Sequence, residues 1–214
     1  MEALIIRDYD AALDQLLVLS MINQDRLDGQ PLCPAEALMD AVAGRSENDP
    51  HLWDRLEPVR TAVIDRGSGP VGIVSFARSL DGKSGELLWM HAGEDLDILT
   101  LCVECALAEL AVPTVRAFNL SSALSLGVEG LPVLRRSVSH QVLLNAKFVP
   151  DAKWTYLSRP ASSVSGATAS HSQVVIEGAS PQWVISFEEA GIRQGQVEVG
   201  MVSTTGVIFY ILVD

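Results

Sequence analysis

Cysteine is scarce in this sequence, and long apolar runs are missing. The three cysteines, Cys33, Cys102 and Cys105, are too few for the disulfide framework of a small secreted domain. No window reaches about 18 consecutive apolar residues, the length that a transmembrane helix requires. The N-terminus lacks the basic region that precedes the apolar stretch of a secretory signal. These features predict a cytoplasmic protein.

Positive charge is also in short supply. The chain has 15 Lys and Arg residues against 27 Asp and Glu, which gives a net charge of −12 and a pI near 4.7. An acidic surface repels phosphate backbones and anionic lipids, so neither nucleic acid nor a membrane is expected as a partner. Arg135 and Arg136 are candidates for a local anion site. The alternative is that they form surface ion pairs.

Cys102 and Cys105 form a C-x-x-C pattern, which suggests a metal or redox site. They lie in an uninterrupted helical pattern, ILTLCVECALAEL, and neither a second C-x-x-C nor an H-x₃₋₅-H follows. Buried structural cysteines on one helix face are therefore the better interpretation. No metal site is predicted.

The hydrophobic pattern of the first 159 residues alternates between strand and helix. The 48% of hydrophobic residues are ample for a buried core. A helix with Asp8 or Asp10 as its cap is expected after the first strand, and the stretch 44–58 is expected to be a loop. Strands are expected at 3–8, 59–66, 71–79, 86–91, 114–120 and within 148–159, and helices at 11–22, 34–43, 96–110 and 135–146.

Short turns rich in Gly and Pro join the strands between residues 59 and 91. Such turns allow only antiparallel pairing, whereas the helix at 96–110 permits the strand at 114–120 to pair in parallel. The sequence thus predicts an α/β (α+β) domain whose central sheet is mixed, mostly antiparallel, and flanked by helices, with extra β-strands at the C-terminal end.

The last part of the chain repeats the β region of the first. A linker rich in Ser, Ala and Gly is expected at 160–172, and strands at 173–177, 183–189, 196–203 and 206–214. Gly72 aligns with Gly195, an offset of 123 residues. A period of this length indicates duplication of a domain.

The segments GPVGIVSFARS, ELLWMHAGEDLDILTLCVECALAEL and VRAFNLSSALSLGVEGLP resemble the GNAT superfamily of N-acetyltransferases. The resemblance implies a GNAT-like domain at 1–159 and a partial second GNAT-like half, strands only, at 173–214, as in a tandem GNAT protein. It is expected that the chain is either naturally truncated or a fragment. In that family the fourth strand holds the pantetheine arm of acetyl-CoA, and the next loop and helix hold its pyrophosphate.

The resemblance implies a set of site residues on and after the strand ELLWMH. Glu94 and Asp95 depart from the family's glycine-rich loop, and they suit the capping of a helix N-terminus better than a phosphate. Plain strand alternation would place Glu86 and His91 on opposite faces, as ordinary strand-end polar residues. The predicted residues are Glu86 and His91 for catalysis, and Leu88, Trp89, Met90 and Gly93 for binding acetyl-CoA or another acyl-CoA.

Two functions follow as hypotheses. The first is an acyltransferase that acts on a small amine or hydroxylated metabolite with an acyl-CoA donor. The second is a catalytically inactive GNAT-fold module for binding or dimerisation. Because GVIFYILVD (206–214) is nearly continuously apolar, a pattern typical of a strand covered on both faces, we expect a homodimer in which the C-terminal strands take part.

Overall fold

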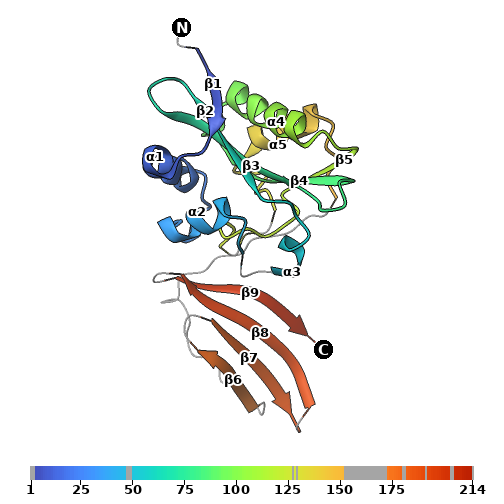
Figure 1. The fold of residues 1–214 in the computed structure, drawn as a ribbon. Coiled ribbons are helices and arrows are strands. Elements are labelled where there is room, and N and C mark those ends of the chain that lie inside the picture. Colours follow the sequence, from blue (N-terminus) through green and yellow to red (C-terminus); the bar gives the residue numbers. More distant parts are fainter. Residues whose placement is uncertain are drawn as a thin grey trace. The chain divides into compact units, whose positions relative to one another are not determined.

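The computed structural model describes residues 3–46, 50–126, 128, 130–151, 173–179, 182–190, 192–202 and 205–213. The chain forms two compact units, one helical and stranded, the other stranded (Figure 1). The expected linker at 160–172 and most of the expected strand at 148–159 lie outside the described residues. Residues 148–151 of that stretch are not in a strand. Among the helices described, none has the length and apolar character needed to cross a membrane.

The first unit is built on a five-stranded sheet. Its strands are β1 (Ile5–Asp8), β2 (Arg60–Asp65), β3 (Pro70–Arg78), β4 (Ser84–His91) and β5 (Thr114–Ala117). They lie side by side in chain order, antiparallel except for the parallel pair β4–β5. The mixed α/β class expected from the sequence is confirmed.

The part of the chain that the structure describes has five helices beside this sheet: α1 (Ala11–Gln24), α2 (Ala35–Val42), α3 (Pro50–Trp53), α4 (Leu96–Leu110) and α5 (Ser137–Asn145). Asp10 is the N-cap of α1, where its carboxylate accepts from the Ala12 N–H at 2.8 Å. The short helix α3 corrects the expectation of a loop at 44–58. It begins at Pro50, a residue whose fixed φ and missing N–H suit a first helical position.

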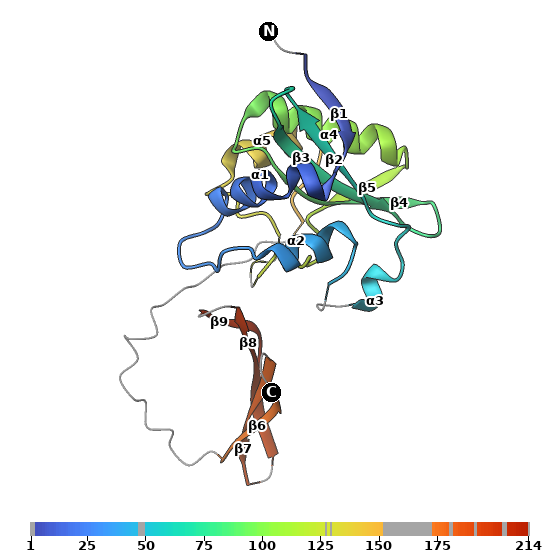
Figure 2. The same ribbon diagram turned by 60° about the vertical axis from the view of Figure 1, so that its left-hand side comes forward.

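The helices cover the sheet on both faces (Figure 2). On one face α4 and α5 pack on residues such as Ile64, Val74 and Leu87. On the other, α1, α2 and α3 cover a second cluster that includes Val63 and Ile73. Cys102 is fully buried in the first cluster, so the structural interpretation of this cysteine is confirmed.

A β-bulge in β4 changes which side chains share a face. Ser75 of β3 pairs with Trp89 and Phe76 with Leu87, so Leu88 is the extra residue. Leu88 and Trp89 therefore both face α1 and α2, while Leu87 and Met90 both face α4 and α5. The plain alternation expected from the sequence for β4 is wrong because a bulge shifts the two-residue period by one.

The β4 strand extends beyond its parallel neighbour. The two strands pair from Ser84–Thr114 to Leu87–Ala117, and the Phe118 N–H donates to the Leu87 carbonyl at 2.9 Å. Residues 88–91 continue past the end of β5. Among the described residues, the side chain of Arg136 takes the Met90 carbonyl at this end of β4.

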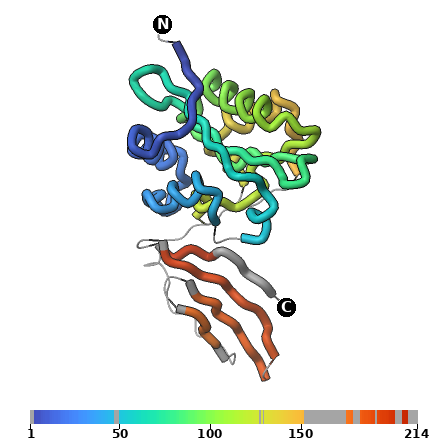
Figure 3. Tube along the Cα trace, viewed as in Figure 1, coloured from blue at the N-terminus to red at the C-terminus, as the bar shows by residue number. Residues whose placement is uncertain are grey.

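The described residues of the second unit form a four-stranded antiparallel sheet, whose chain can be followed in Figure 3. It consists of β6 (Gln173–Ala179), β7 (Gln182–Glu189), β8 (Ile192–Val202) and β9 (Thr205–Val213), in that order.

Its pairing register repeats that of β1–β4. The pair Ile64–Gly72 corresponds to Phe187–Gly195, at the same offset of 123 residues. Both bulges recur as well: the shift at Ser75/Phe76 reappears at Glu198/Val199, and the shift at Ile64/Asp65 reappears at Phe187/Glu188. The internal repeat expected from the sequence is thus visible in the hydrogen-bond ladder. The helices that separate β1 from β2 have no counterpart between β6 and β7.

Candidate functional site

The end of β4 carries a buried Asp–His pair. Asp25 is the residue that ends α1, and its Oδ2 lies 2.7 Å from His91 Nδ1. The two side chains are only 6% and 11% exposed. They are 66 residues apart in the sequence, so the fold alone brings them together.

The protonation of this pair follows from its surroundings. Burial lowers the pKa of His91 to about 4, with Arg136 acting in the same direction. Burial would raise the pKa of Asp25, but its hydrogen bond with His91 and the nearby arginines hold it below its usual value. Asp25 is therefore an ionised acceptor and His91 is neutral. Its one N–H is on Nδ1, which leaves the Nε2 lone pair available as a base.

Arg136 lies at the centre of a buried network beside this pair. It is 3% exposed, and its Nη2 donates to the Met90 carbonyl at 2.7 Å and to Ser139 Oγ at 2.9 Å. Its Nε lies 3.6 Å from Asp25 Oδ2 and 3.4 Å from Glu94 Oε1. The expectation of a surface ion pair is therefore wrong for Arg136. It fills the edge of β4 where β5 has ended, and two carboxylates balance its charge.

Glu94 and Asp95 occupy backbone groups that would otherwise be free to bind an anion. Asp95 Oδ1 accepts from the N–H groups of Asp97 and Ile98 at 3.0 and 3.1 Å, which caps α4 as expected. Glu94 Oε2 accepts from the first N–H groups of α5, those of Val138 and Ser139, at 2.8 and 3.1 Å. This loop therefore fits a pyrophosphate poorly, because carboxylates already take its donors.

Glu86, at the other end of β4, is also buried. It is 6% exposed, its Oε1 lies 3.5 Å from Arg116 Nη1, and its Oε2 has no hydrogen-bond partner among the described residues. Burial raises the pKa of Glu86 despite the opposing effect of Arg116. A carboxylate that is hard to ionise and incompletely hydrogen-bonded differs from an ordinary strand-end residue.

The bulge places Glu86 and His91 on the same face of the sheet, which corrects the expectation of opposite faces. Val115 and Ala117 pack against the α4–α5 cluster, so Arg116, which alternates with them, points to the α1–α2 side together with Glu86. His91 reaches Asp25 of α1 on that side. At about 3.3 Å per residue the two groups are roughly 15 Å apart along the strand, so they do not touch, and the buried Leu88 and Trp89 lie between them.

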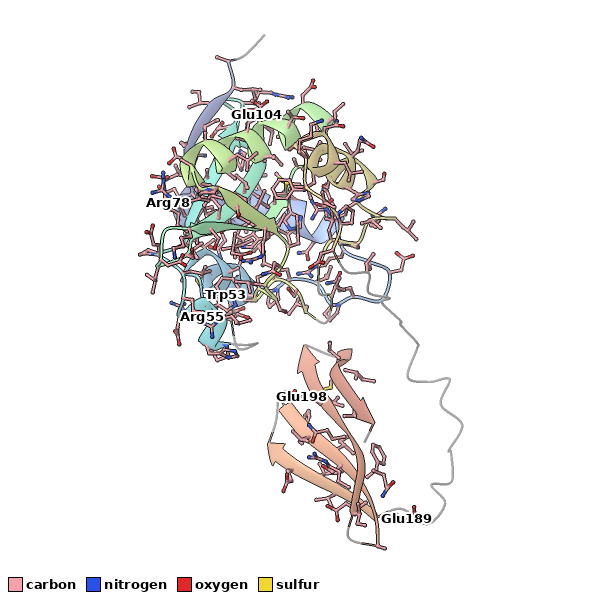
Figure 4. All side chains as sticks on the ribbon, turned by 90° about the vertical axis from the view of Figure 1, so that its right-hand side faces the viewer. Trp53, Arg55, Arg78, Glu104, Glu189 and Glu198 are labelled. Carbon is pink, nitrogen blue, oxygen red and sulfur yellow. The ribbon has the colours of Figure 1, made fainter. Side chains whose placement is uncertain are left out.

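The four residues predicted to bind the acyl-CoA do not lie together: two are in the α1–α2 cluster, one is in the α4–α5 cluster and one is exposed. Leu88 and Trp89 lie in the α1–α2 cluster, together with Trp53 of α3, which is labelled in Figure 4. The Trp89 and His91 rings have centroids 6.3 Å apart. Met90 points to the other face, and its carbonyl is taken by Arg136. Gly93 is exposed, with a φ of +57° and open space around it.

Sequence reasoning missed Asp25, Ser139 and the burial of Arg136. Nothing local marks Asp25, because an aspartate after an apolar helix is usually a solvated end. The network as a whole offers one neutral imidazole base held by a carboxylate, one buried glutamate, and an arginine at the strand edge. No protein-family model, no curated protein and no solved structure matches this chain.

Proposed function

We propose that the first unit is a GNAT-like acyltransferase that transfers an acyl group from acetyl-CoA or another acyl-CoA to a small amine or hydroxylated metabolite. The observation that carries this proposal is the bulge at Leu88. It puts Glu86 and His91 on one face of β4, with Glu86 in the part paired with β5 and His91 in the part that runs past β5. The scarcity of cysteine and the acidic surface fit a protein of the cytoplasm.

In this proposal His91 is the general base. As the acceptor nitrogen attacks the thioester carbonyl carbon, its proton passes to His91 Nε2, and Asp25 stabilises the imidazolium that forms. The carbon–sulfur bond breaks, and the departing thiolate takes up the proton. Glu86, with its raised pKa, lies roughly 15 Å from His91 along β4, so it does not reach the same acceptor nitrogen and is the second residue to test as a base.

Donor binding would rest on the backbone of residues 88–90 and not on the loop after β4. Asp95 and Glu94 already accept hydrogen bonds from backbone N–H groups at the N-terminal ends of α4 and α5. The diphosphate of the acyl-CoA therefore stays in solvent in this arrangement. We therefore expect acetyl-CoA and acetyl-pantetheine, which lacks the nucleotide and diphosphate, to bind with affinities within about tenfold of each other.

The alternative function is a binding or dimerisation module without acyl-CoA chemistry. The specific observation in its favour is that Arg136 already occupies the Met90 carbonyl, while Asp95 already caps α4. An acyl-CoA that binds here must displace the Arg136 side chain and the Asp95 carboxylate, or bind beside them. In this alternative the Asp25–His91 pair serves the stability of the fold.

Isothermal titration of the full chain with acetyl-CoA, CoA and acetyl-pantetheine separates these functions. Binding of both thioesters, followed by transfer to amines that His91→Ala abolishes and Asp25→Asn weakens, supports the acyltransferase. Asp95→Asn keeps a capping oxygen but removes the charge, and serves as the control for the loop. If neither thioester binds at millimolar concentration, the acyltransferase proposal is wrong and the binding module stands.

A further inference from the structure

The sheet of the second unit has one apolar face and one face, the polar face, on which charged and polar residues are mixed with valines. Strand pairing puts the following described residues on the apolar face: Ile176, Trp183, Ile185, Phe187, Val197, Val199, Met201 and Ile208, with Gly178, Gly195 and Gly206 between them. None of these carries a charge. The opposite face holds Glu177, Ser186, Gln196 and Glu198, the last labelled in Figure 4, together with Val175, Val184 and Val207.

The apolar face is uncovered among the described residues. Ile176 is 62% exposed and Ile208 is 56% exposed. The corresponding residues of the first unit are buried: Ile64, the counterpart of Phe187, and Leu87, the counterpart of Ile208, are both 0% exposed beneath α4 and α5. A solvent-exposed apolar sheet face that spans four strands marks an interaction site.

We propose that this face is the dimer interface of the protein, in which two copies of the second unit pack face to face as a β-sandwich. A second copy suits the surface because the face carries no charge that would need a complementary partner. The chain is strongly acidic, and a sandwich of this kind leaves Glu177 and Glu198 of both copies in solvent. Packing through the polar face would instead bring like charges together.

The size of the face sets the strength of the dimer. Four strands spaced by about 4.8 Å, each with roughly eight residues at about 3.4 Å, present about 500 Å² per copy. The pair would bury about 1,000 Å², the low end for specific interfaces. The dimer is therefore reversible, and two sheets packed about 10 Å apart allow the side chains to interdigitate as in other sandwiches.

Sedimentation velocity of the full chain, from about 1 to 100 µM, measures this equilibrium directly. We expect a monomer–dimer transition in this range. Ile185→Glu places a charge in the apolar face and should raise the dimer dissociation constant at least about 100-fold. The control is Ser186→Glu, one position along β7 on the opposite face, which should leave the constant within about threefold. Circular dichroism verifies that both variants fold.

Oxidation of the wild-type protein by hydrogen peroxide gives an independent measurement that needs no variant. Met201 lies on the apolar face and is 39% exposed, so its oxidation, followed by mass spectrometry, should slow at concentrations where the dimer forms. A chain that stays monomeric throughout the range overturns the proposal. So does a dimer that persists in folded Ile185→Glu, or a Met201 oxidation rate that does not depend on protein concentration.

Discussion

Acidification should destabilise the first unit through His91, before most carboxylates are protonated. The pKa of His91 in the folded chain is about 4, against about 6.5 in an unfolded chain. Above pH 6.5 the imidazole is neutral in both states, so its contribution to stability does not change. As the pH falls from 6.5 towards 4, the unfolded state takes up a proton and the folded state does not. The free energy of unfolding therefore falls throughout this window.

The size of the effect follows from the shift in pKa. A difference of about 2.5 units, at about 1.4 kcal/mol per unit, corresponds to roughly 3 kcal/mol lost between pH 7 and pH 4. The depressed pKa of Asp25 adds a loss of the same sign, but only as the pH falls below the pKa of an unfolded aspartate, near 3.9. Glu86, whose raised pKa lets the folded state take up a proton first, contributes with the opposite sign, so the His91 contribution is the difference between the wild type and a variant without this histidine.

Urea denaturation at a series of pH values, followed by circular dichroism, tests this reasoning. His91→Asn removes the titration while its side-chain NH₂ still donates to Asp25, so the variant should show a much flatter profile between pH 4.5 and 6.5. His51→Asn, at an exposed histidine of α3, is the matched control and should keep the wild-type slope. The reasoning is refuted if the His91→Asn profile is as steep as that of the wild type.

Two further substitutions test the packing and the charge of the sheet. Gly72→Ala should destabilise the first unit by about 1–3 kcal/mol, because its Cβ would lie 2.4 Å from Ile98 Cγ2 in α4. Gly206→Ala, where the nearest atom is 3.7 Å away, should change stability little, and equal urea midpoints for the two variants would contradict the packing argument. Glu86→Gln should raise the free energy of unfolding at pH 7 and not at pH 3.5, because a raised folded pKa means that ionisation costs the folded state more. A loss of stability at pH 7 would show that the contact with Arg116 outweighs the cost of burial.

The order of the longer elements was predictable because each of them has a local signal, whereas α3, four residues long, is too short to show a helical repeat. The helix expected at 96–110 corresponds to α4, since its apolar residues repeat at helical spacing and Asp95 precedes them. The strands β2 to β4 follow from β-rich runs separated by Gly- and Pro-containing turns. The parallel strand β5 follows from the helix before it, which is long enough for a crossover.

The site was only partly predictable, because its decisive feature has no local signal. ELLWMH reads as a regular strand, and nothing in its letters marks Leu88 as the extra residue. One bulge was enough to move His91 to the face that Glu86 occupies. The partners of His91 and Met90, Asp25 and Arg136, come from segments 66 and 46 residues away, and single-sequence patterns do not report contacts at such separations.

The repeat itself separates the two proposed roles. Both bulges occur in both sheets, although the residues at the main one differ completely, Ser75 and Phe76 against Glu198 and Val199. The bulges therefore belong to the architecture and not to any local sequence.

The titratable residues of the first sheet do not recur in the second. Glu86 pairs with Ala77, and the equivalent pair is Val207 with Gly200. His91 pairs with Ile73, and the equivalent pair is Leu212 with Gln196. Chemistry that depends on Glu86 and His91 is thus confined to the first unit. The second unit keeps the sheet without these groups, which is the composition expected of a surface for association and not of a second catalytic site.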